Sequence, residues 1–330
     1  MRIAGGLAGA VAVAILGLLA IHLVAPQRTG TLALTLIAEP YLALVALLAV
    51  PVALRRWPRW PLVVAATLIV FSVLRYGPTL VSLPAPAVSG DSLAVVTWNI
   101  LADGSGTPRL LGGLARVEAD LVGIEELHNA GATAIESDQT LTERYPHRVL
   151  RPDWSVLGIG LLSRHAIVEH ETWTDPPLMR AVVQPDGRQP LTVFVGHPLP
   201  ARIHMLAGLV PVGLDATVRD EKIQFIRTLV ERDLAAGQSV LVIGDFNVTS
   251  REPAYATLAA GLRDAHLEAG LGPGFTWRPP RLAGVPMGLL RIDYILASAD
   301  FRVSSAHADC AEQSDHCRVS AVVWRPATGE

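Results

Sequence analysis

The sequence predicts a four-layer α/β sandwich, made of two packed mixed β-sheets flanked by helices and preceded by three transmembrane helices. Three observations support this fold class. Apolar residues are concentrated before residue 84, and short apolar runs rich in β-branched residues recur between residues 92 and 324. Several consecutive runs have no helical pattern between them. The sheets should therefore be mixed or antiparallel, because purely parallel sheets need a crossover helix after each strand.

The N-terminal part is predicted to be a membrane anchor covering residues 1–83. The chain of 330 residues is 51% hydrophobic and 17% charged, with a mean hydropathy of +0.39, which is too apolar for an ordinary soluble enzyme. Apolar segments at about 3–24, 31–54 and 60–80 are each near the ~20 residues needed to cross a bilayer. A cleaved signal peptide at residues 1–24 is the alternative, disfavoured by the two apolar segments that follow.

The charges around these segments predict the orientation of the chain. Residues 55–59 contain Arg55, Arg56 and Arg59 and form the most basic short connection, so the positive-inside rule places this loop in the cytoplasm. Three spans would then place everything after about residue 84 outside the cytoplasm, as a multi-pass protein of the plasma membrane. Glu39 lies within the second apolar segment, where an ionisable group is costly, and Pro40 beside it is able to break a helix. The role of Glu39 stays open.

Residues 84–90 are predicted to be a linker, and residues 91–330 one large catalytic domain. This domain has 29 acidic and 21 basic residues, a net charge of −8, which argues against sequence-independent nucleic-acid binding. Helical patterns cover about Arg109–Glu118, Ala132–Arg144 and Val218–Ala236. The predicted strands are Ser92–Trp98, Asp120–Ile124, Ile159–Ser163, Ala181–Gln184, Leu191–Gly196, Ser239–Ile243, Arg291–Ala297 and Arg318–Trp324.

Two features of this domain allow alternative interpretations. The stretch 199–214 is apolar, is interrupted by Pro and Gly, and fits neither a helix nor a strand period. It is interpreted as a loop that covers the core, with a lip that faces lipid as the alternative. Cys310 and Cys317 lie close together near the C-terminus, and outside the cytoplasm they would form a disulfide or remain two free thiols.

Polar residues interrupt or end the apolar strands at six places. One such residue alone is more often a strand-end cap or a satisfied core group. Burying an unpaired carboxylate costs on the order of several kcal/mol, however, so six such places sharing one chemistry indicate a single metal-bound, phosphate-handling site. The residues are Asn99, the pair Glu125 and Glu126, His197, the pair Asp245 and Asn247, Asp293, and the pair Asp315 and His316.

The order of these residues resembles the endonuclease/exonuclease/phosphatase superfamily, which includes DNase I-like nucleases, sphingomyelinases and inositol polyphosphate 5-phosphatases. The resemblance spans residues 91–325. The family usually has Gln where this chain has Glu125. The matching segments are Trp98-Asn99, Glu125-Glu126, Gly160-Leu161-Leu162-Ser163-Arg164, Gly196-His197, Gly244-Asp245-Phe246-Asn247, Ile292-Asp293 and Ser314-Asp315-His316.

The resemblance implies a metal-dependent phosphoric ester hydrolase that uses Mg²⁺, with Mn²⁺ as an alternative. Glu126 would be the chief metal ligand, and Asn99 and Asp315 would complete the site directly or through water. Mg²⁺ keeps several waters, so one or two carboxylates are enough.

The resemblance also implies the catalytic roles. Asp245 would position or activate the attacking water, while Asn247 and His197 would donate hydrogen bonds to the phosphoryl oxygens. His316, oriented by Asp293, would act as the general base or as a partner to the transition state.

The spans together with this domain also resemble the VanJ-type membrane proteins associated with teicoplanin resistance. That resemblance implies a role in recycling undecaprenyl pyrophosphate. The tether itself would place the site near lipid headgroups at the extracytoplasmic face, so a lipid-linked phosphate or pyrophosphate, or a phospholipid, is the expected substrate class. A membrane-anchored nuclease is the first alternative, for which a local basic groove would be needed. A non-catalytic scaffold is the second, disfavoured because a competent residue occupies every expected catalytic position. The groove residues would be Arg164, Arg180, Arg278 and Arg281.

Overall fold

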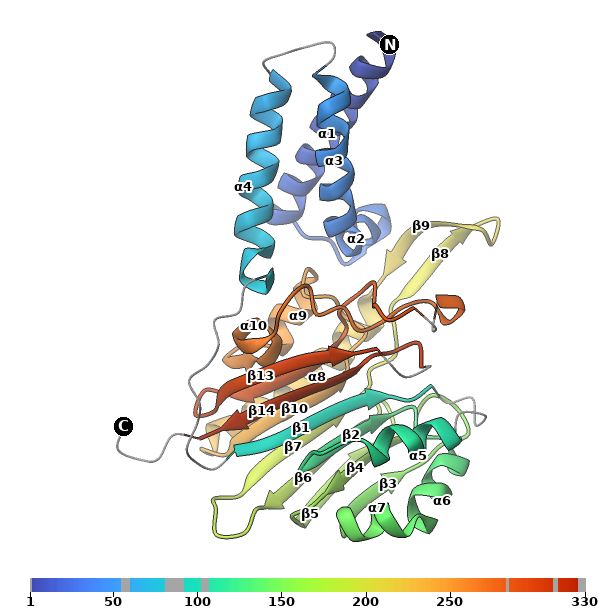
Figure 1. The fold of residues 1–330 in the computed structure, drawn as a ribbon, viewed down its shortest axis with the longest axis vertical. Helices are drawn as coiled ribbons and strands as arrows, with labels where there is room; N and C mark the ends of the chain where they lie inside the picture. The colour runs from blue at the N-terminus through green and yellow to red at the C-terminus, as the bar shows by residue number, and fades with distance from the viewer. Residues whose placement is uncertain are drawn as a thin grey trace.

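The computed structural model describes residues 2–54, 60–80, 92–101, 107–282, 285–310 and 314–325. Figure 1 shows a group of N-terminal helices standing on one end of a β-sandwich, as the fold prediction requires. The predicted linker at 84–90 and the basic loop at 55–59 lie outside the described residues.

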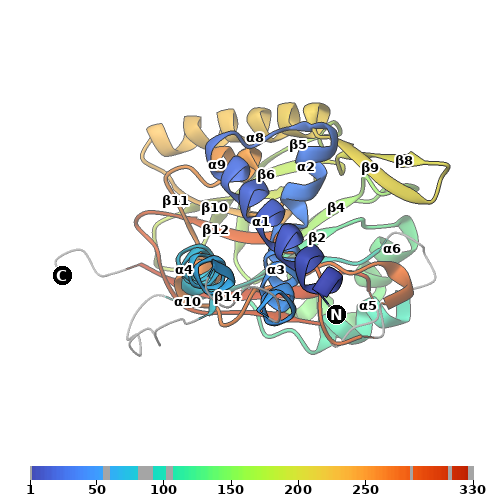
Figure 2. The same ribbon diagram turned by 90° about the horizontal axis from the view of Figure 1, so that it is seen from above.

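The N-terminal helices form a small bundle. Helix α1 (Arg2–Val24) packs on α3 (Glu39–Ala53), and α4 (Trp60–Leu80) packs on both. Figure 2 looks down the bundle and shows the three helices grouped over the sandwich. Helices α1 and α4 are each long and apolar enough to cross a membrane.

The single helix predicted at 31–54 is wrong. The structure divides it into α2 (Gly30–Ile37) and α3, which meet at an angle of 77°. In one continuous helix Pro40 would lack the N–H that bonds to residue 36, and its ring would clash with that carbonyl. The chain therefore breaks at Ala38, and Pro40 lies in the first turn of α3, where its missing N–H costs nothing. The anchor therefore has two candidate spans, or three if the bent pair crosses as one.

Glu39 is fully buried within this bundle and joins its helices. Its carboxylate accepts hydrogen bonds from Arg75 Nε and Tyr76 Oη of α4, both at 3.1 Å, and lies 3.6 Å from His22 Nδ1 of α1. The guanidinium of Arg251 lies 4.6 Å above the ring of Tyr76. This charged cluster thus links the N-terminal helices to the β-sandwich domain.

The sandwich consists of two six-stranded mixed sheets, which confirms the predicted fold class. In each sheet one central pair is parallel, β1 with β2 and β7 with β10, and the other pairs are antiparallel. The first sheet has the order β13 (Arg302–Asp309), β14 (Arg318–Trp324), β1 (Ser92–Asn99), β2 (Leu121–Glu125), β4 (Ile159–Ser163) and β3 (His147–Arg151). The second has the order β11 (Leu262–Asp264), β12 (Asp293–Ser298), β10 (Ser239–Asp245), β7 (Leu191–Gly196), β6 (Leu178–Gln184) and β5 (Ala166–Trp173).

Helices cover the outer faces of both sheets and complete the four layers. The core between the sheets contains buried aliphatic side chains from both, for example Val95 and Val193. Helices α5 (Thr107–Ala115), α6 (Asn129–Ser137) and α7 (Gln139–Arg144) cover the first sheet, and α8 (Thr217–Ala235) and α9 (Pro253–Leu258) cover the second. The short α10 (Ala265–Ala269) and a 3₁₀ turn (Pro280–Leu282) lie in the connections.

The predicted helix at 132–144 is two helices, because the Asp138 side chain accepts a hydrogen bond from Leu141 N and caps α7. The predicted core-covering loop at 199–214 is also wrong. This stretch forms a two-stranded ribbon, β8 (Arg202–Leu206) and β9 (Val210–Asp215), in which residues 202–212 are exposed.

Candidate active site

The sheet topology brings the polar strand ends to one edge of the sandwich. The parallel pairs end at this edge, and the antiparallel strand β12 begins there, with Asp293 directly opposite Asp245 in register. Gly244, the first residue of the Gly244–Asn247 turn, allows the end of β10 to lie close against the end of β7. Gly244 has a φ of 141°, and a Cβ on it would lie 2.0 Å from the carbonyl oxygen of Gly196.

Asp245 lies at the centre of the polar cluster. Its Oδ2 accepts a hydrogen bond from Asn99 Nδ2 at 3.0 Å, and Asn99 Nδ2 also lies 3.0 Å from Glu126 Oε1. His197 Nε2 lies 3.5 Å from Asp245 Oδ2 and 3.7 Å from Glu126 Oε1. Asn99 and His197 therefore each bridge the carboxylates of Asp245 and Glu126, and four predicted site residues from four strand ends form one cluster.

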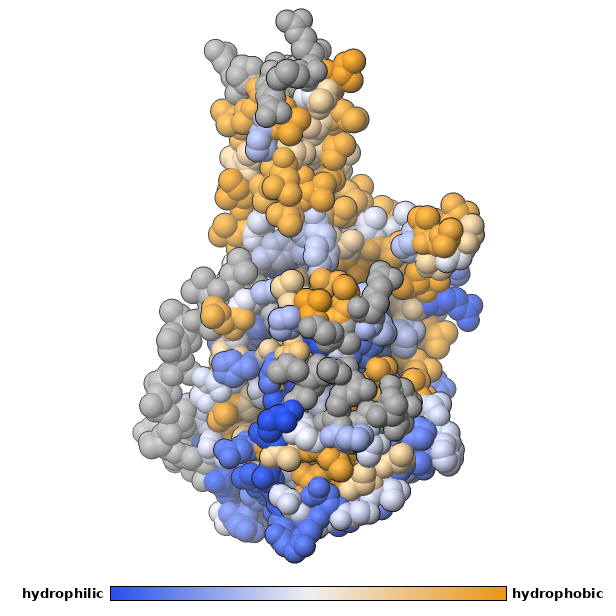
Figure 3. Space-filling view, turned by 45° about the vertical axis from the view of Figure 1, so that its right-hand side comes forward, coloured by the Kyte–Doolittle hydropathy of each residue, from blue (hydrophilic) through white to orange (hydrophobic). Residues whose placement is uncertain are grey.

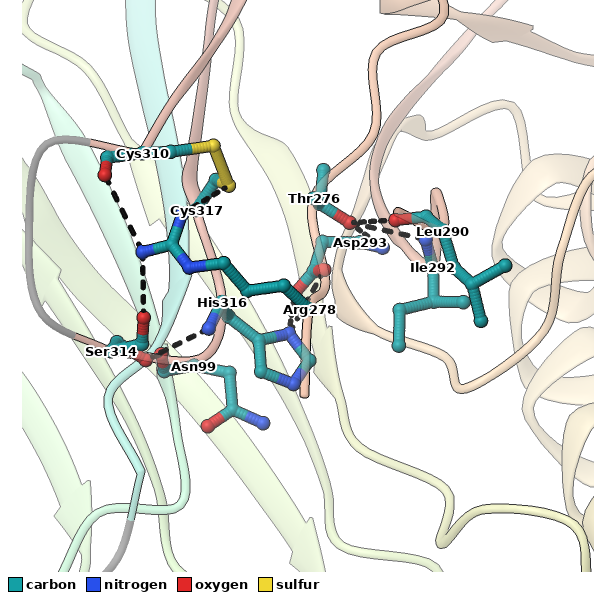
Figure 4. Close-up of a disulfide and its surroundings, with 10 residues drawn as sticks. All are labelled: Asn99, Thr276, Arg278, Leu290, Ile292, Asp293, Cys310, Ser314, His316 and Cys317. Atoms are coloured by element: carbon teal, nitrogen blue, oxygen red, sulfur yellow. Dashed lines mark hydrogen bonds and ion pairs between the residues drawn. A yellow bond between two sulfur atoms is a disulfide. The ribbon is translucent and has the colours of Figure 1, made fainter. Parts of the chain in front are cut away.

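His316 and Asp293 form a buried pair beside Asp245. His316 Nδ1 lies 3.0 Å from both oxygens of Asp293 (Figure 4). His316 Nε2 lies 3.6 Å from Asp245 Oδ2. Burial opposes the charged imidazole, but Asp293 and Asp245 outweigh it and raise the pKa of His316 to about 10. Thr276 Oγ1 accepts from the backbone N–H of Asp293 at 3.2 Å and fixes the strand there. The imidazole is thus held with Nδ1 on Asp293 and Nε2 toward the site.

The two histidines also determine the charge of Asp245. Burial alone would raise the pKa of Asp245, but His316 and His197 lower it below its usual value. Burial likewise opposes the charged form of His197, and Asp245 reverses this and raises its pKa. His197 Nδ1 lies 3.1 Å from the Val156 carbonyl oxygen, which can only accept a hydrogen bond, so Nδ1 carries a proton and donates it. Nε2 faces the carboxylates. The cluster therefore places the ionised carboxylate of Asp245 between two imidazoles whose charged forms it favours.

Asn247 completes the turn beside Asp245. Its φ of 51° is left-handed, and its backbone N–H donates to Asp245 Oδ1 at 2.9 Å. Its side-chain Nδ2 donates to the carbonyl oxygen of Pro198 at 3.2 Å, on the segment that follows His197. Asn247 thus connects the ends of β7 and β10.

Glu125 and Glu126 occupy different environments although they are adjacent. Glu126 has a left-handed φ of 55°, which turns its side chain toward Asn99 and His197. Glu125 is fully buried and accepts a hydrogen bond from Thr97 Oγ1 at 2.7 Å. Burial raises the pKa of Glu125 to about 8, so at neutral pH it is mainly protonated and resembles the Gln usual at this position.

The carboxylates of the cluster fit a divalent cation. Ligand atoms of Asp245, Asp293 and His316 lie within 4.8 Å of one another. Asp315 is 7% exposed, burial raises its pKa, and its Oδ1 is buried without a hydrogen-bond partner among the described residues. The carboxylates of Glu126, Asp245, Asp293 and Asp315 supply the hard oxygen donors that Mg²⁺ and Mn²⁺ prefer.

Asn99 departs from a direct ligand geometry. It presents Nδ2, not Oδ1, to Glu126 and Asp245, and its Oδ1 accepts from Leu101 N at 3.1 Å. Its hydrogen bonds therefore orient the two carboxylates, and contact with a cation would pass through water.

The loop that carries Asp315 and His316 is held by the disulfide that the sequence left open as one of two alternatives, and by an arginine that the sequence did not predict. Cys310 and Cys317 form a disulfide across it, and Arg278 lies fully buried against it (Figure 4). Arg278 Nη2 donates to the carbonyl oxygen of Ser314 at 2.9 Å. The backbone N–H of Arg278 donates to the carbonyl oxygen of Asp315, also at 2.9 Å. The only sequence signal was the cysteine spacing, because buried arginines are rare and hard to predict.

Four arginines were considered for a basic groove in the nuclease alternative, and the three whose side chains the structure describes do not form one. Arg278 points into the disulfide loop, and Arg180 is buried between Asp233 and Glu169, at 2.6 and 2.7 Å. Arg164 pairs with Asp120 before β2, at the opposite end of that strand from Glu125. The side chain of Arg281 lies outside the described residues.

Comparison with known proteins supports the family resemblance. The model of the Endonuclease/Exonuclease/phosphatase family matches residues 96–316, which include all eight residues given a catalytic or metal-binding role above, and Glu125. No curated protein matches the sequence significantly.

Solved structures share the fold at low sequence identity. A functionally unknown conserved protein from Enterococcus faecalis V583 has 16% identity and a TM-score of 0.56, covering 71% of this chain and 100% of the other. A mutant beta toxin from Staphylococcus aureus, with bound magnesium ions, has 16% identity and a TM-score of 0.52, covering 72% and 100%. D. rerio TDP2, complexed with single strand DNA product, has 20% identity and a TM-score of 0.52, covering 71% and 99%.

Proposed function

This chain belongs to the endonuclease/exonuclease/phosphatase family, and we propose from this premise that it is a membrane-anchored Mg²⁺-dependent phosphoesterase. Its substrate would be a lipid-linked phosphate ester or pyrophosphate, such as a phospholipid or an undecaprenyl pyrophosphate-like molecule. The observation that carries the proposal is the buried cluster of Asp245, Asp293 and His316 in a chain that also has apolar helices long enough to cross a membrane.

In this proposal Glu126 and Asp315 hold the cation, with Asn99 orienting Glu126. The magnesium in the beta toxin structure supports the choice of ion. When bound, the cation would polarise a phosphoryl oxygen and offset the charge that develops on it.

The protein's own residues would perform the proton transfers and the orientation. Asp245 accepts a hydrogen bond from the attacking water and aligns it with phosphorus. His197 and Asn247 donate hydrogen bonds to the phosphoryl oxygens. Burial opposes the charged form of His197, but Asp245 raises its pKa and so favours the protonated, donating imidazole. His316 Nε2 exchanges a proton with the reacting oxygens, while Asp293 holds Nδ1 and stabilises the imidazolium.

A cavity at the junction of the anchor and the catalytic domain supports a lipid-linked substrate. It has a volume of about 200 Å³, and most of its walls are apolar, which suits part of a hydrocarbon chain. One wall is near the catalytic pair, because the carbonyl oxygen of Leu290 accepts from Thr276 N, and Thr276 Oγ1 accepts from Asp293 N. The anchor contributes Ile37, Pro40 and Tyr76, and the catalytic domain contributes Phe275, Leu289 and Leu290.

The side of the membrane is also part of the proposal. The arginines at 55, 56 and 59 favour a cytoplasmic loop, which with three spans places the catalytic domain at the extracytoplasmic face. The disulfide between Cys310 and Cys317 supports this placement, because disulfides persist in oxidising compartments.

A nuclease is the second candidate, and the D. rerio TDP2 structure with a single strand DNA product is the reason to test it. The net charge of −8 on residues 91–330 and the inward pairing of Arg180 and Arg278 favour the lipid substrate.

The deciding experiment uses the full chain in lipid nanodiscs with Mg²⁺. Phosphate release or headgroup release is measured from a lipid pyrophosphate, a phospholipid and single-stranded DNA, for wild type, His316→Ala and the exposed control His170→Ala. We expect hydrolysis of a lipid substrate by wild type and by His170→Ala only. Cleavage of DNA alone would establish the nuclease, and equal rates in all three proteins would reject the site.

A further inference from the structure

The ribbon of β8 and β9 projects from the sandwich beside the anchor (Figure 1). Its residues 202–212 are all exposed, on both faces of the ribbon. An isolated pair of strands is marginally stable in water, and an exposed apolar patch of this kind marks an interaction site. Figure 3 shows apolar surface on a projection beside the anchor. The exposed apolar residues here are Leu199, Ile203, Met205, Leu206, Leu209, Val210 and Val212, with Leu209 82% exposed at the tip.

Both ends of the ribbon are connected to the Gly244–Asn247 turn through contacts with Asn247. On the β8 side, Pro198 accepts a hydrogen bond from Asn247 Nδ2 at 3.2 Å. On the β9 side, α8 follows directly, and Arg219 Nη1 donates to the carbonyl oxygen of Asn247 at 2.8 Å. The ribbon is therefore a direct extension of the site that contains Asp245.

The base of the ribbon is also joined to the anchor. Thr31 Oγ1 donates to the carbonyl oxygen of Val212 at 2.8 Å, and Thr29 and Gly30 form bridges with β9. Ala33 of α2 packs against Leu214 in a small apolar cluster. The exposed apolar surface is thus continuous with the helices proposed to lie in the membrane.

We propose that the β8–β9 ribbon is a lip that enters the headgroup region of the bilayer and contacts the lipid that carries the substrate phosphate. This inference rests on the proposed membrane setting. The one acidic residue of the ribbon, Asp215, lies at its base opposite Arg202, and the projecting residues 203–212 have none. This absence of negative charge at the tip suits anionic headgroups, in contrast to the net charge of −8 on the domain.

The depth of insertion follows from the backbone. Two strands alone leave outer-edge N–H and C=O groups that hydrocarbon does not satisfy. The ribbon therefore lies at the interface, with Leu206 and Leu209 among the upper acyl carbons and Arg202 among the phosphates.

The first test measures insertion without activity. The native cysteines are joined in a disulfide, so Leu209→Cys can be labelled selectively with an environment-sensitive fluorophore in the full chain. In nanodiscs containing anionic lipid, we expect a blue-shifted emission that is quenched by lipids carrying a quencher at the upper acyl carbons. The matched control is Val168→Cys on β5, which is 62% exposed and lies at the far edge of the second sheet. Water-like emission at both positions would overturn the proposal, and so would crosslinking between copies at position 209, which would identify a second chain as the occupant.

The second test separates the lip from catalysis. We expect Leu206→Asp with Leu209→Asp to lower hydrolysis of vesicle-borne lipid phosphate at least tenfold while leaving hydrolysis of bis-p-nitrophenyl phosphate unchanged. Val168→Asp should change neither rate. An equal loss on both substrates would indicate a structural role and reject the lip. Unchanged lipid hydrolysis in the double variant would also reject it but leave the proposed function intact. If wild type hydrolyses no lipid, the label at position 209 still decides the inference.

Discussion

Two buried carboxylates on neighbouring strands have opposite surroundings. Asp264 at the end of β11 pairs with Arg291, accepts from Tyr255 Oη at 2.5 Å, and accepts from the backbone N–H groups of His266 and Leu267. Burial opposes its ionisation, but Arg291 lowers the pKa of Asp264. Its charge and its hydrogen-bonding capacity are both balanced inside the protein.

Asp293 at the start of β12 is surrounded by excess negative charge instead. Burial raises its pKa, and Asp245, directly opposite in register, raises it further. Glu126 and Asp315 add two more carboxylates, against the two imidazoles of His197 and His316. Asp264 and Asp293 are both buried, so burial does not distinguish them. Charge balance does: the charge of Asp264 is neutralised by Arg291, whereas the carboxylates around Asp293 outnumber the nearby imidazoles, which suits a cation-binding site.

Removing the charge of Asp293 should have the largest effect, on activity. We expect Asp293→Asn to lower kcat about 10³- to 10⁴-fold, because the amide no longer fixes the tautomer of His316 or stabilises its imidazolium. Phosphate release and the thermal midpoint are measured together. Asp264→Asn is the matched control, and its kcat per folded molecule should stay within about twofold of wild type, as for residues outside the site. A comparable fall of kcat in Asp293→Asn and Asp264→Asn would contradict the distinction between the two carboxylates.

The same substitution at Asp264 should have the larger effect on stability. Asp264→Asn leaves the guanidinium of Arg291 buried without its partner, which should cost about 3–5 kcal/mol of unfolding free energy. Denaturant unfolding of the full chain in detergent, followed by tryptophan fluorescence, measures it. Asp264→Asn combined with Arg291→Met should recover most of the loss, because no unpaired charge stays buried and the amide oxygen still accepts from the backbone N–H groups of His266 and Leu267. A single-variant cost near zero would mean that the pair is not structural.

Metal binding sharpens the comparison further. Mg²⁺ at about 100 times its Kd should raise the unfolding free energy by about 2.7 kcal/mol, because only the folded chain brings Glu126 and Asp315 together. Glu126→Gln should abolish this shift, whereas Asp264→Asn should retain it on its lower baseline. Chelation with EDTA should abolish activity. Stabilisation by Mg²⁺ that survives in Glu126→Gln would place the cation elsewhere.

Glu125 should give the smallest effect, visible in the pH dependence of stability. Its pKa rises on folding from the ordinary value of 4.5 to about 8, so folding favours its protonated form. The stability it contributes is complete below about pH 4.5 and is lost as pH rises toward 8, by up to about 1.4 kcal/mol per pH unit. Glu125→Gln should flatten this slope between pH 6 and 8 and keep activity. An unchanged slope would show that Glu125 is ionised in the folded protein.

The sequence predicted the centre of each sheet well and the edges poorly. Strands buried on both faces, such as β7 and β10, appear as continuous apolar runs. The edge strands β3, β5 and β13 have partly exposed residues and no such run, so they were missed. Their existence depends on the neighbouring strand that they pair with.

The site was predictable because its residues follow the strands one by one, and topology alone brings them together. Asp264 and Arg291, 27 residues apart, gave no such signal, because their pairing depends on tertiary packing. The raised pKa of Glu125 and the inward direction of Arg278 likewise depend on burial, which the sequence does not display.

The bend at Ala38 has a consequence for the membrane itself. It leaves α3 with 15 residues, a length of about 22 Å at ~1.5 Å per residue, against a hydrocarbon thickness of about 30 Å. Its neighbours α1 and α4 have 23 and 21 residues and match that thickness. In the proposed setting the lipids beside α3 must compress to meet its ends, and hydrophobic mismatch costs fractions of a kcal/mol per Å. Because α1 and α4 match the full thickness, this compression stays local, and the bend makes the side of the bundle beside α3 the preferred place for lipids with short acyl chains.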